Sequence, residues 1–82
     1  MSVADEIRTF IFDELMEGQP AEGDPVAEGK LDSLAMEQVI GFIEDTYGIT
    51  FSDEELVIDN FRSIGTVAEL VERKRAAAAS GA

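Results

Sequence analysis

The sequence predicts an all-α fold, a four-helix bundle with three long helices, one short helix and a long loop between the first and second helices. Apolar residues recur at three- and four-residue spacing in three separate segments, which is the period of an amphipathic helix. No segment alternates apolar and polar residues for long enough to indicate a β-strand. With 82 residues the chain is expected to be one domain, because only one core can be built at this size.

The first helix is expected from Ser2 to Glu17, with Ser2 as its N-cap and Gly18 as its stop. Its apolar face is predicted to consist of Val3, Ile7, Phe10, Ile11 and Leu15. The next segment, from Gln19 to Leu31, has almost no apolar period and is interrupted by Pro20, Gly23, Pro25 and Gly29. We therefore expect a loop that runs the length of the bundle.

The second helix is expected from Ser33 to Tyr47, with Gly48 as its stop. Its inward-facing residues are predicted to be Leu34, Val39, Ile40, Ile43 and Tyr47. Gly41 costs about 1 kcal/mol relative to alanine inside a helix, so it indicates either close helix packing or no role. A further apolar stripe along this helix consists of Met36, Val39, Ile40, Phe42 and Ile43. We expect it to form part of the core, and the alternative is that it lines a pocket for a bound chain.

Two more helices follow. Ser52 and Glu55 form a capping-box pattern, which predicts a short helix that starts at Ser52. Ser63 or Asn60 is expected to cap the last helix, whose apolar face is predicted to contain Ile64, Val67, Leu70 and Val71. Residues 1–75 are expected to form the domain, and residues 76–82 a frayed or disordered tail.

The composition excludes several classes of function. The chain has no Cys and no His, so it lacks disulfides, thiolate nucleophiles, imidazole bases and the usual zinc ligands. The acidic segments do not have the spacing of a calcium loop, and we expect no metal site. A net charge of −12 disfavours nucleic acid and anionic membranes as partners. We expect a cytoplasmic monomer that binds basic protein surfaces. The alternative interpretation is that the negative charge serves only to keep the protein soluble.

Ser33 is the candidate for chemistry. Serine and threonine hydroxyls are the nucleophiles available, and no histidine can activate them, so a partner enzyme must perform any reaction. Ser33 follows Asp32 and precedes Leu34 at a point where a loop becomes a helix. An attached phosphate would lie there at the positive end of the helix dipole. The alternative is that Ser33 or Asp32 is simply the helix N-cap.

The stretch Leu31-Asp32-Ser33-Leu34, followed by an amphipathic helix that ends in Tyr47-Gly48-Ile49, resembles the acyl carrier and peptidyl carrier protein family. Asp53-Glu54-Glu55-Leu56 and Asn60-Phe61-Arg62-Ser63-Ile64 resemble the third helix and the entry to the fourth in free-standing carriers of secondary metabolism. The resemblance implies an acyl-carrier-like bundle without catalytic activity. It also implies that Ser33 bears 4′-phosphopantetheine, transferred from coenzyme A by a phosphopantetheinyl transferase.

The resemblance further implies that the arm carries acyl or aminoacyl groups as thioesters in polyketide or nonribosomal peptide biosynthesis. Asp32 would orient the helix start, and Leu34 would face a partner. Ala35 stands where many family members have an acidic residue, which favours a pathway-specific carrier over a housekeeping one. The expected docking surface for basic enzymes consists of Glu37, Glu44, Asp45, Asp53, Glu54 and Glu55. The alternative is that these residues form a solvated face without a partner. The competing hypothesis is an acidic helical adaptor without a prosthetic group.

Overall fold

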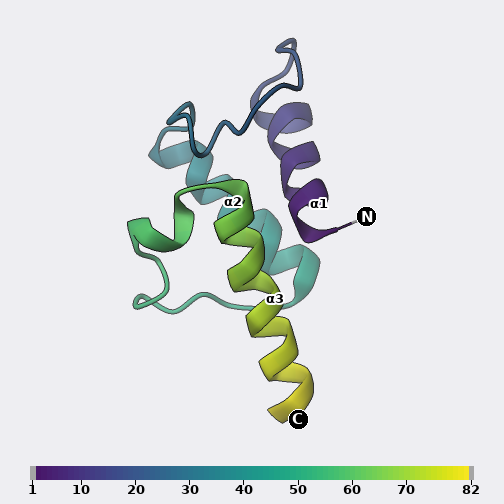
Figure 1. Ribbon diagram of the computed structural model, residues 1–82, viewed down its shortest axis with the longest axis vertical. Coiled ribbons are helices and arrows are strands. Elements are labelled where there is room, and N and C mark those ends of the chain that lie inside the picture. The colour runs from purple at the N-terminus through teal and green to yellow at the C-terminus, as the bar shows by residue number, and fades with distance from the viewer. Residues whose placement is uncertain (1, 82) are drawn as a thin grey trace.

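The computed structural model describes residues 2–81, and these residues form helices joined by loops and turns (Figure 1). In chain order the elements are α1 (Val3–Phe10), η1 (Ile11–Leu15), α2 (Ser33–Tyr47), η2 (Ile58–Phe61) and α3 (Ile64–Gly81). Residues 2–81 contain no β-strand, which confirms the predicted all-α class. Within the same residues, no helix has both the length and the apolar character needed to cross a membrane.

The first helix starts where the sequence predicts but changes type before its end. Ser2 caps α1, because its Oγ accepts a hydrogen bond from the Asp5 N–H at 3.1 Å and its N–H donates to the Asp5 carboxylate at 3.4 Å. After Phe10 the chain widens into the π-helical turn η1 and leaves it at Leu15. The single helix expected to reach Glu17 is therefore two shorter elements.

The second helix has the predicted bounds. Gly48 ends α2 in the left-handed conformation, with a φ of 65°, and its N–H donates to the carbonyl of Glu44. The prediction that Leu34 faces inward is wrong, since this side chain is 63% exposed. Full burial along α2 is reached only at Val39 and Ile43, so the first turn of the helix stands outside the core.

The short helix expected at Ser52 is not formed there. The capping pattern closes a turn instead, in which the N–H and Oγ of Ser52 donate to the Glu55 carboxylate at 2.9 and 3.2 Å. The backbone is extended at Val57, which prevents the turn from growing into a helix. The 3₁₀-helix η2 follows at Ile58–Phe61, and its Asn60 donates to the carbonyl of Glu55 at 2.9 Å.

The last helix, α3, is capped by Ser63, whose Oγ accepts a hydrogen bond from the Thr66 N–H at 3.0 Å. The structure continues α3 past Arg75 to Gly81, through the segment for which the sequence predicts a tail. Alanine has the highest helix propensity, and this segment begins with four alanines. Ala82 lies outside the described residues. The C-terminal turns of α3 extend beyond the rest of the molecule (Figure 1).

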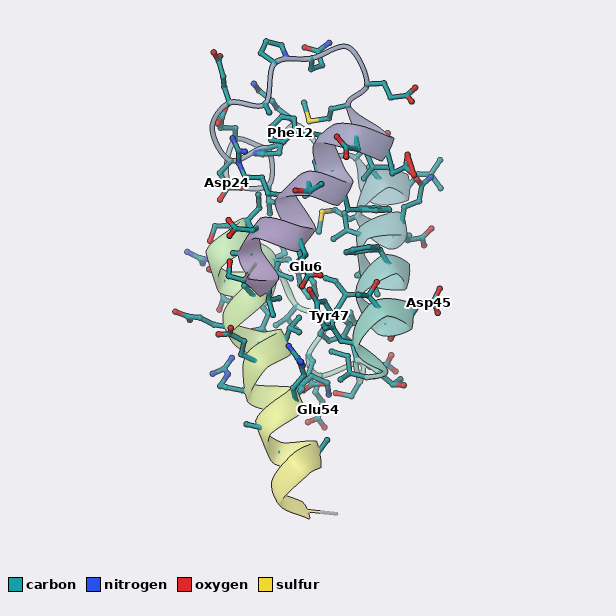
Figure 2. All side chains as sticks on the ribbon, turned by 90° about the vertical axis from the view of Figure 1, so that its right-hand side faces the viewer. Glu6, Phe12, Asp24, Asp45, Tyr47 and Glu54 are labelled. Carbon is teal, nitrogen blue, oxygen red and sulfur yellow. The ribbon has the colours of Figure 1, made fainter. Side chains whose placement is uncertain are left out.

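The core lies between the three α-helices. α1 packs against both α2 and α3, and Figure 2 shows α1 in front with the other two helices on either side. Burying one large aliphatic side chain stabilises a fold by about 1.5–3 kcal/mol. The buried core residues are Val3, Ile7, Ile11, Val39, Ile43, Phe51, Ile64, Val67, Ala68, Leu70 and Val71.

The long loop between η1 and α2 is fixed to the helices by hydrogen bonds. Asp24 Oδ1 accepts bonds from the N–H groups of Val26 and Ala27, both at 3.0 Å, and closes a turn. Its Oδ2 accepts a bond from the Ile64 N–H at 3.0 Å, at the start of α3. Arg8 of α1 donates to the carbonyls of Ala21 and Gly23 at 2.7 and 3.4 Å. The loop therefore delivers the chain to the start of α2 in a defined position.

Asp24→Ala removes the acceptor of three backbone N–H groups in two different elements, and we expect it to lower the free energy of unfolding by about 2 kcal/mol. Urea denaturation followed by far-UV circular dichroism measures this. Glu22→Ala, a charge removal at an exposed position in the same loop, is the matched control and should change stability by less than about 0.5 kcal/mol. Equal stability of the two variants would contradict a role for Asp24 in holding the loop.

Tyr47 links α2 to α1, because its hydroxyl donates to Glu6 Oε1 at 2.7 Å (Figure 2). Partial burial, and to a lesser extent this hydrogen bond, raises the pKa of Tyr47 from 10.0 to about 12. The folded pKa lies above the unfolded one, so the neutral phenol contributes stability below pH 10.0 that is lost as the pH rises towards about 12.

We expect Tyr47→Phe to be less stable than the wild type by about 1 kcal/mol at neutral pH. The difference should narrow above pH 10.0, because only the wild type has a phenol to ionise. Urea denaturation of both proteins at a series of pH values from neutral to strongly alkaline measures this. A difference that stays constant across the series would show that the bond does not couple to the titration of Tyr47.

Candidate functional site

At the start of α2, the two candidate cap residues, Asp32 and Ser33, have different roles. Asp32 is the N-cap, because its Oδ1 accepts a hydrogen bond from the Ala35 N–H at 2.8 Å. Ser33 is the first residue of the helix and is exposed. Its hydroxyl has no hydrogen-bond partner among the described residues. The capping requirement is thus met without Ser33, and it does not explain why a serine stands at this position.

A pocket of about 430 Å³ lies directly beside Ser33, between α2 and the segment that contains η2. Its wall is mostly apolar, with the polar groups of Asp32, Ser33 and Glu37 along one side. The apolar lining consists of Leu31, Met36, Ile40, Leu56, Val57, Ile58 and Phe61. The pocket can therefore receive an apolar group that is held at the Ser33 hydroxyl.

Exposed apolar side chains gather around this pocket. Leu34 is 63% exposed and Ile58 is 83% exposed, and Leu56 and Val57 are exposed as well. Residues 56–58 are not among the predicted site residues. The available signal was a run of three large apolar residues directly after a capped turn, without a helical period to bury them. Leu34 fits the expected partner-facing role better than a place in the core.

The acidic residues expected to form a docking surface divide into two groups. Glu44 is half-buried and accepts a hydrogen bond from the Phe51 N–H at 3.0 Å. Glu55 accepts bonds from Ser52 and, at 2.7 Å, from the Lys74 ammonium group, which lowers the pKa of Glu55. These two carboxylates hold the connection between α2 and η2 in place. The exposed residues, which are available to a partner, are Glu37, Asp45, Asp53 and Glu54.

The exposed acidic residues do not form one surface. Glu37 lines the pocket beside Ser33, whereas Asp45 lines a different groove, between α1 and α2. Figure 2 shows Asp45 projecting outward from α2, with Glu54 beside the lower half of α3 and Asp24 near the top of that helix. Among residues 2–81, no group of three or more Asp and Glu residues is arranged to hold a metal ion.

The chemistry available at Ser33 is limited to that of an unactivated hydroxyl. The chain contains no histidine, and the nearest carboxylate, Asp32, already accepts the Ala35 N–H. No lysine or arginine lines the described wall of the adjacent pocket. Among the described residues, the Ser33 hydroxyl makes no hydrogen bond to a group that could act as its base.

A second pocket, of about 600 Å³, lies elsewhere, between residues 48–50 and the C-terminal half of α3. Its lining includes Lys74 and Glu55, which pair with each other at 2.7 Å. It contains no nucleophile with a base, and its size alone does not indicate a function.

The chain matches no family model, no curated protein and no solved structure in the three comparisons made.

The geometry at the start of α2 predicts different effects for two neighbouring substitutions. Asp32→Ala should lower the free energy of unfolding by about 1 kcal/mol, because it leaves the Ala35 N–H without its acceptor. Ser33→Ala should change stability by less than about 0.5 kcal/mol, since alanine is a better helix former and no hydrogen bond is lost. Thermal and urea denaturation of the two variants measure this. A larger loss for Ser33→Ala than for Asp32→Ala would assign the cap to Ser33.

Proposed function

We propose that this chain is a carrier protein that holds acyl or aminoacyl groups as thioesters on a 4′-phosphopantetheine arm attached to Ser33. The observation that carries this proposal is the exposed Ser33 hydroxyl, which is free of the capping role that Asp32 performs. The resemblance of Leu31-Asp32-Ser33-Leu34 and the following helix to acyl and peptidyl carriers supports it. In this proposal, the four helices of the carrier fold are α1 with η1, α2, η2 and α3.

The surroundings of Ser33 fit a phosphodiester with a flexible apolar extension. The hydroxyl lies in the first turn of a helix of 15 residues, where backbone N–H groups and the helix dipole favour a phosphate. The adjacent pocket offers an apolar wall to whatever the arm carries. When bound, the arm supplies the thiol that this cysteine-free chain lacks.

The role of the chain's own residues is positioning. Ser33 Oγ would attack the pyrophosphate of coenzyme A in the active site of a magnesium-dependent phosphopantetheinyl transferase. The new P–O bond forms as the bond to adenosine 3′,5′-bisphosphate breaks, and the hydroxyl proton passes to the transferase. Asp32 holds the helix start that presents Ser33. The chain itself catalyses nothing, and the tether raises the local concentration of its cargo for the enzymes that process it.

Partner enzymes with basic docking surfaces would contact the face around Ser33. Leu34, Leu56 and Ile58 provide exposed apolar contacts there, and Glu37 provides a charge at the edge of the pocket. Central apolar anchors with a charged rim are typical of protein interfaces. The proposal places this carrier in the cytoplasm, in a polyketide or nonribosomal peptide pathway.

The second candidate function is an acidic adaptor that binds a basic protein without a prosthetic group. The net charge of −12, with Asp53 and Glu54 exposed, favours it. An adaptor does not require Ser33, so the two hypotheses separate at this residue.

The intact mass of the protein after incubation with coenzyme A, magnesium and a broad-specificity phosphopantetheinyl transferase tests the proposal. We expect the wild type to gain one phosphopantetheine and Ser33→Ala to gain none. Ser52→Ala, which removes another exposed serine hydroxyl, is the matched control and should still be modified. Absence of any gain, from protein shown to be folded and previously unmodified, would reject the carrier and leave the adaptor.

A further inference from the structure

A pair of stacked aromatic rings lies on the face formed by α1 and α2. The ring centroids of Phe10 and Phe42 are 4.3 Å apart, with 15° between the ring planes. Both rings are only partly buried, and each lines two open grooves of about 440 and 430 Å³. These grooves share no lining residue with the pocket beside Ser33. The face is therefore separate from the proposed attachment site.

Gly41 lines one of these grooves, and no packing contact within the chain requires a glycine at this position. It lies inside α2, where alanine is the better helix former, and a Cβ atom at this position would meet nothing within 4 Å. Close approach of another helix of this protein therefore does not explain the glycine. Gly41 lines the groove next to Phe42, so the space that it leaves is open to another molecule.

The charges around the aromatic pair have one sign. Glu6, Asp13 and Glu14 line the groove on the α1 side, and Asp45 lines the groove on the α2 side. No lysine or arginine lines the described wall of either groove. Arg75 of α3 lies over a different ring, with its guanidinium 5.0 Å from the ring centroid of Tyr47. A guanidinium group on the Phe10–Phe42 pair would thus meet aromatic rings and carboxylates together.

We propose that the α1–α2 face is a second docking surface, which binds an arginine-bearing helical segment of a partner protein. The arginine stacks on a ring face of the Phe10–Phe42 pair, and the carboxylates of Glu14 and Asp45 attract the segment from either side. Gly41 allows the backbone of the segment to approach α2 closely. This surface does not depend on the carrier function, since none of its residues is part of the Ser33 site.

The test uses a synthetic helical peptide of about 15 residues, built from alanine and leucine with arginines on one face. The same peptide with citrulline in place of arginine keeps the shape and removes the charge. Two-dimensional amide NMR of the full chain should show saturable shifts centred on residues 6–14 and 38–46 with the arginine peptide. The citrulline peptide should bind at least about tenfold more weakly.

Substitution of Gly41 separates binding from folding. Gly41→Ala should raise the melting temperature by about 4 °C and weaken peptide binding about threefold, and Gly41→Leu should weaken binding about tenfold. Gly65→Ala is the matched control, because it also adds a methyl group at a helical glycine without a close contact, and it should leave binding unchanged. Asp45→Asn should weaken binding, whereas Glu54→Gln should not.

Three outcomes would overturn the proposal. The first is the absence of saturable binding of the arginine peptide to the wild-type chain. The second is a set of shifts spread over all acidic segments or centred on residues 52–58. The third is that the Gly41→Leu variant, shown to be folded by its own amide spectrum, binds the arginine peptide as tightly as the wild type does.

Discussion

The carboxylate of Asp24 joins parts of the chain that are far apart in sequence, and the placement of the other elements depends on it. One oxygen closes a turn in the long loop, and the other binds the first N–H of α3, 40 residues away. Pro25, the next residue, is fully buried, and it anchors the turn in the interior. Because the loop is held at this point, the chain reaches Asp32 in a fixed register and α2 begins there.

Excess negative charge constrains the rest of the structure. With 6 cationic and 18 acidic residues, self-repulsion opposes the compact state. Three of the six cations hold elements together. Arg8 binds the loop, Lys74 pairs with Glu55 at 2.7 Å, and Arg75 lies over the ring of Tyr47. The faces of α2 are left with carboxylates and apolar groups, which suit basic partners at both proposed surfaces.

The two surfaces on α2 share one arrangement of residues. On each, large apolar side chains are left partly or largely exposed, and carboxylates lie at the edge. Desolvation of such apolar groups by a partner supplies affinity, whereas the charges chiefly increase the association rate and select the sign of the partner. Two faces of one helix can in this way bind two different partners without overlap.

The sequence by itself determined the helical class, the bounds of α2, the cap at Ser2, Ser63 or Asn60 as the cap of α3, and Ser33 as the residue of interest. These features are local, since they depend on apolar spacing and on capping groups within a few residues of one another. The tertiary structure decided which of Asp32 and Ser33 caps α2, that Leu34 is exposed, and that Ser52 and Glu55 close a turn. It also decided that Glu44 and Glu55 are bonded within the fold while Asp45 is free for a partner. The exposure of Leu34 and the pairing of Glu55 with Lys74 depend on which distant segment lies against the residue, and apolar spacing along the chain does not contain that information.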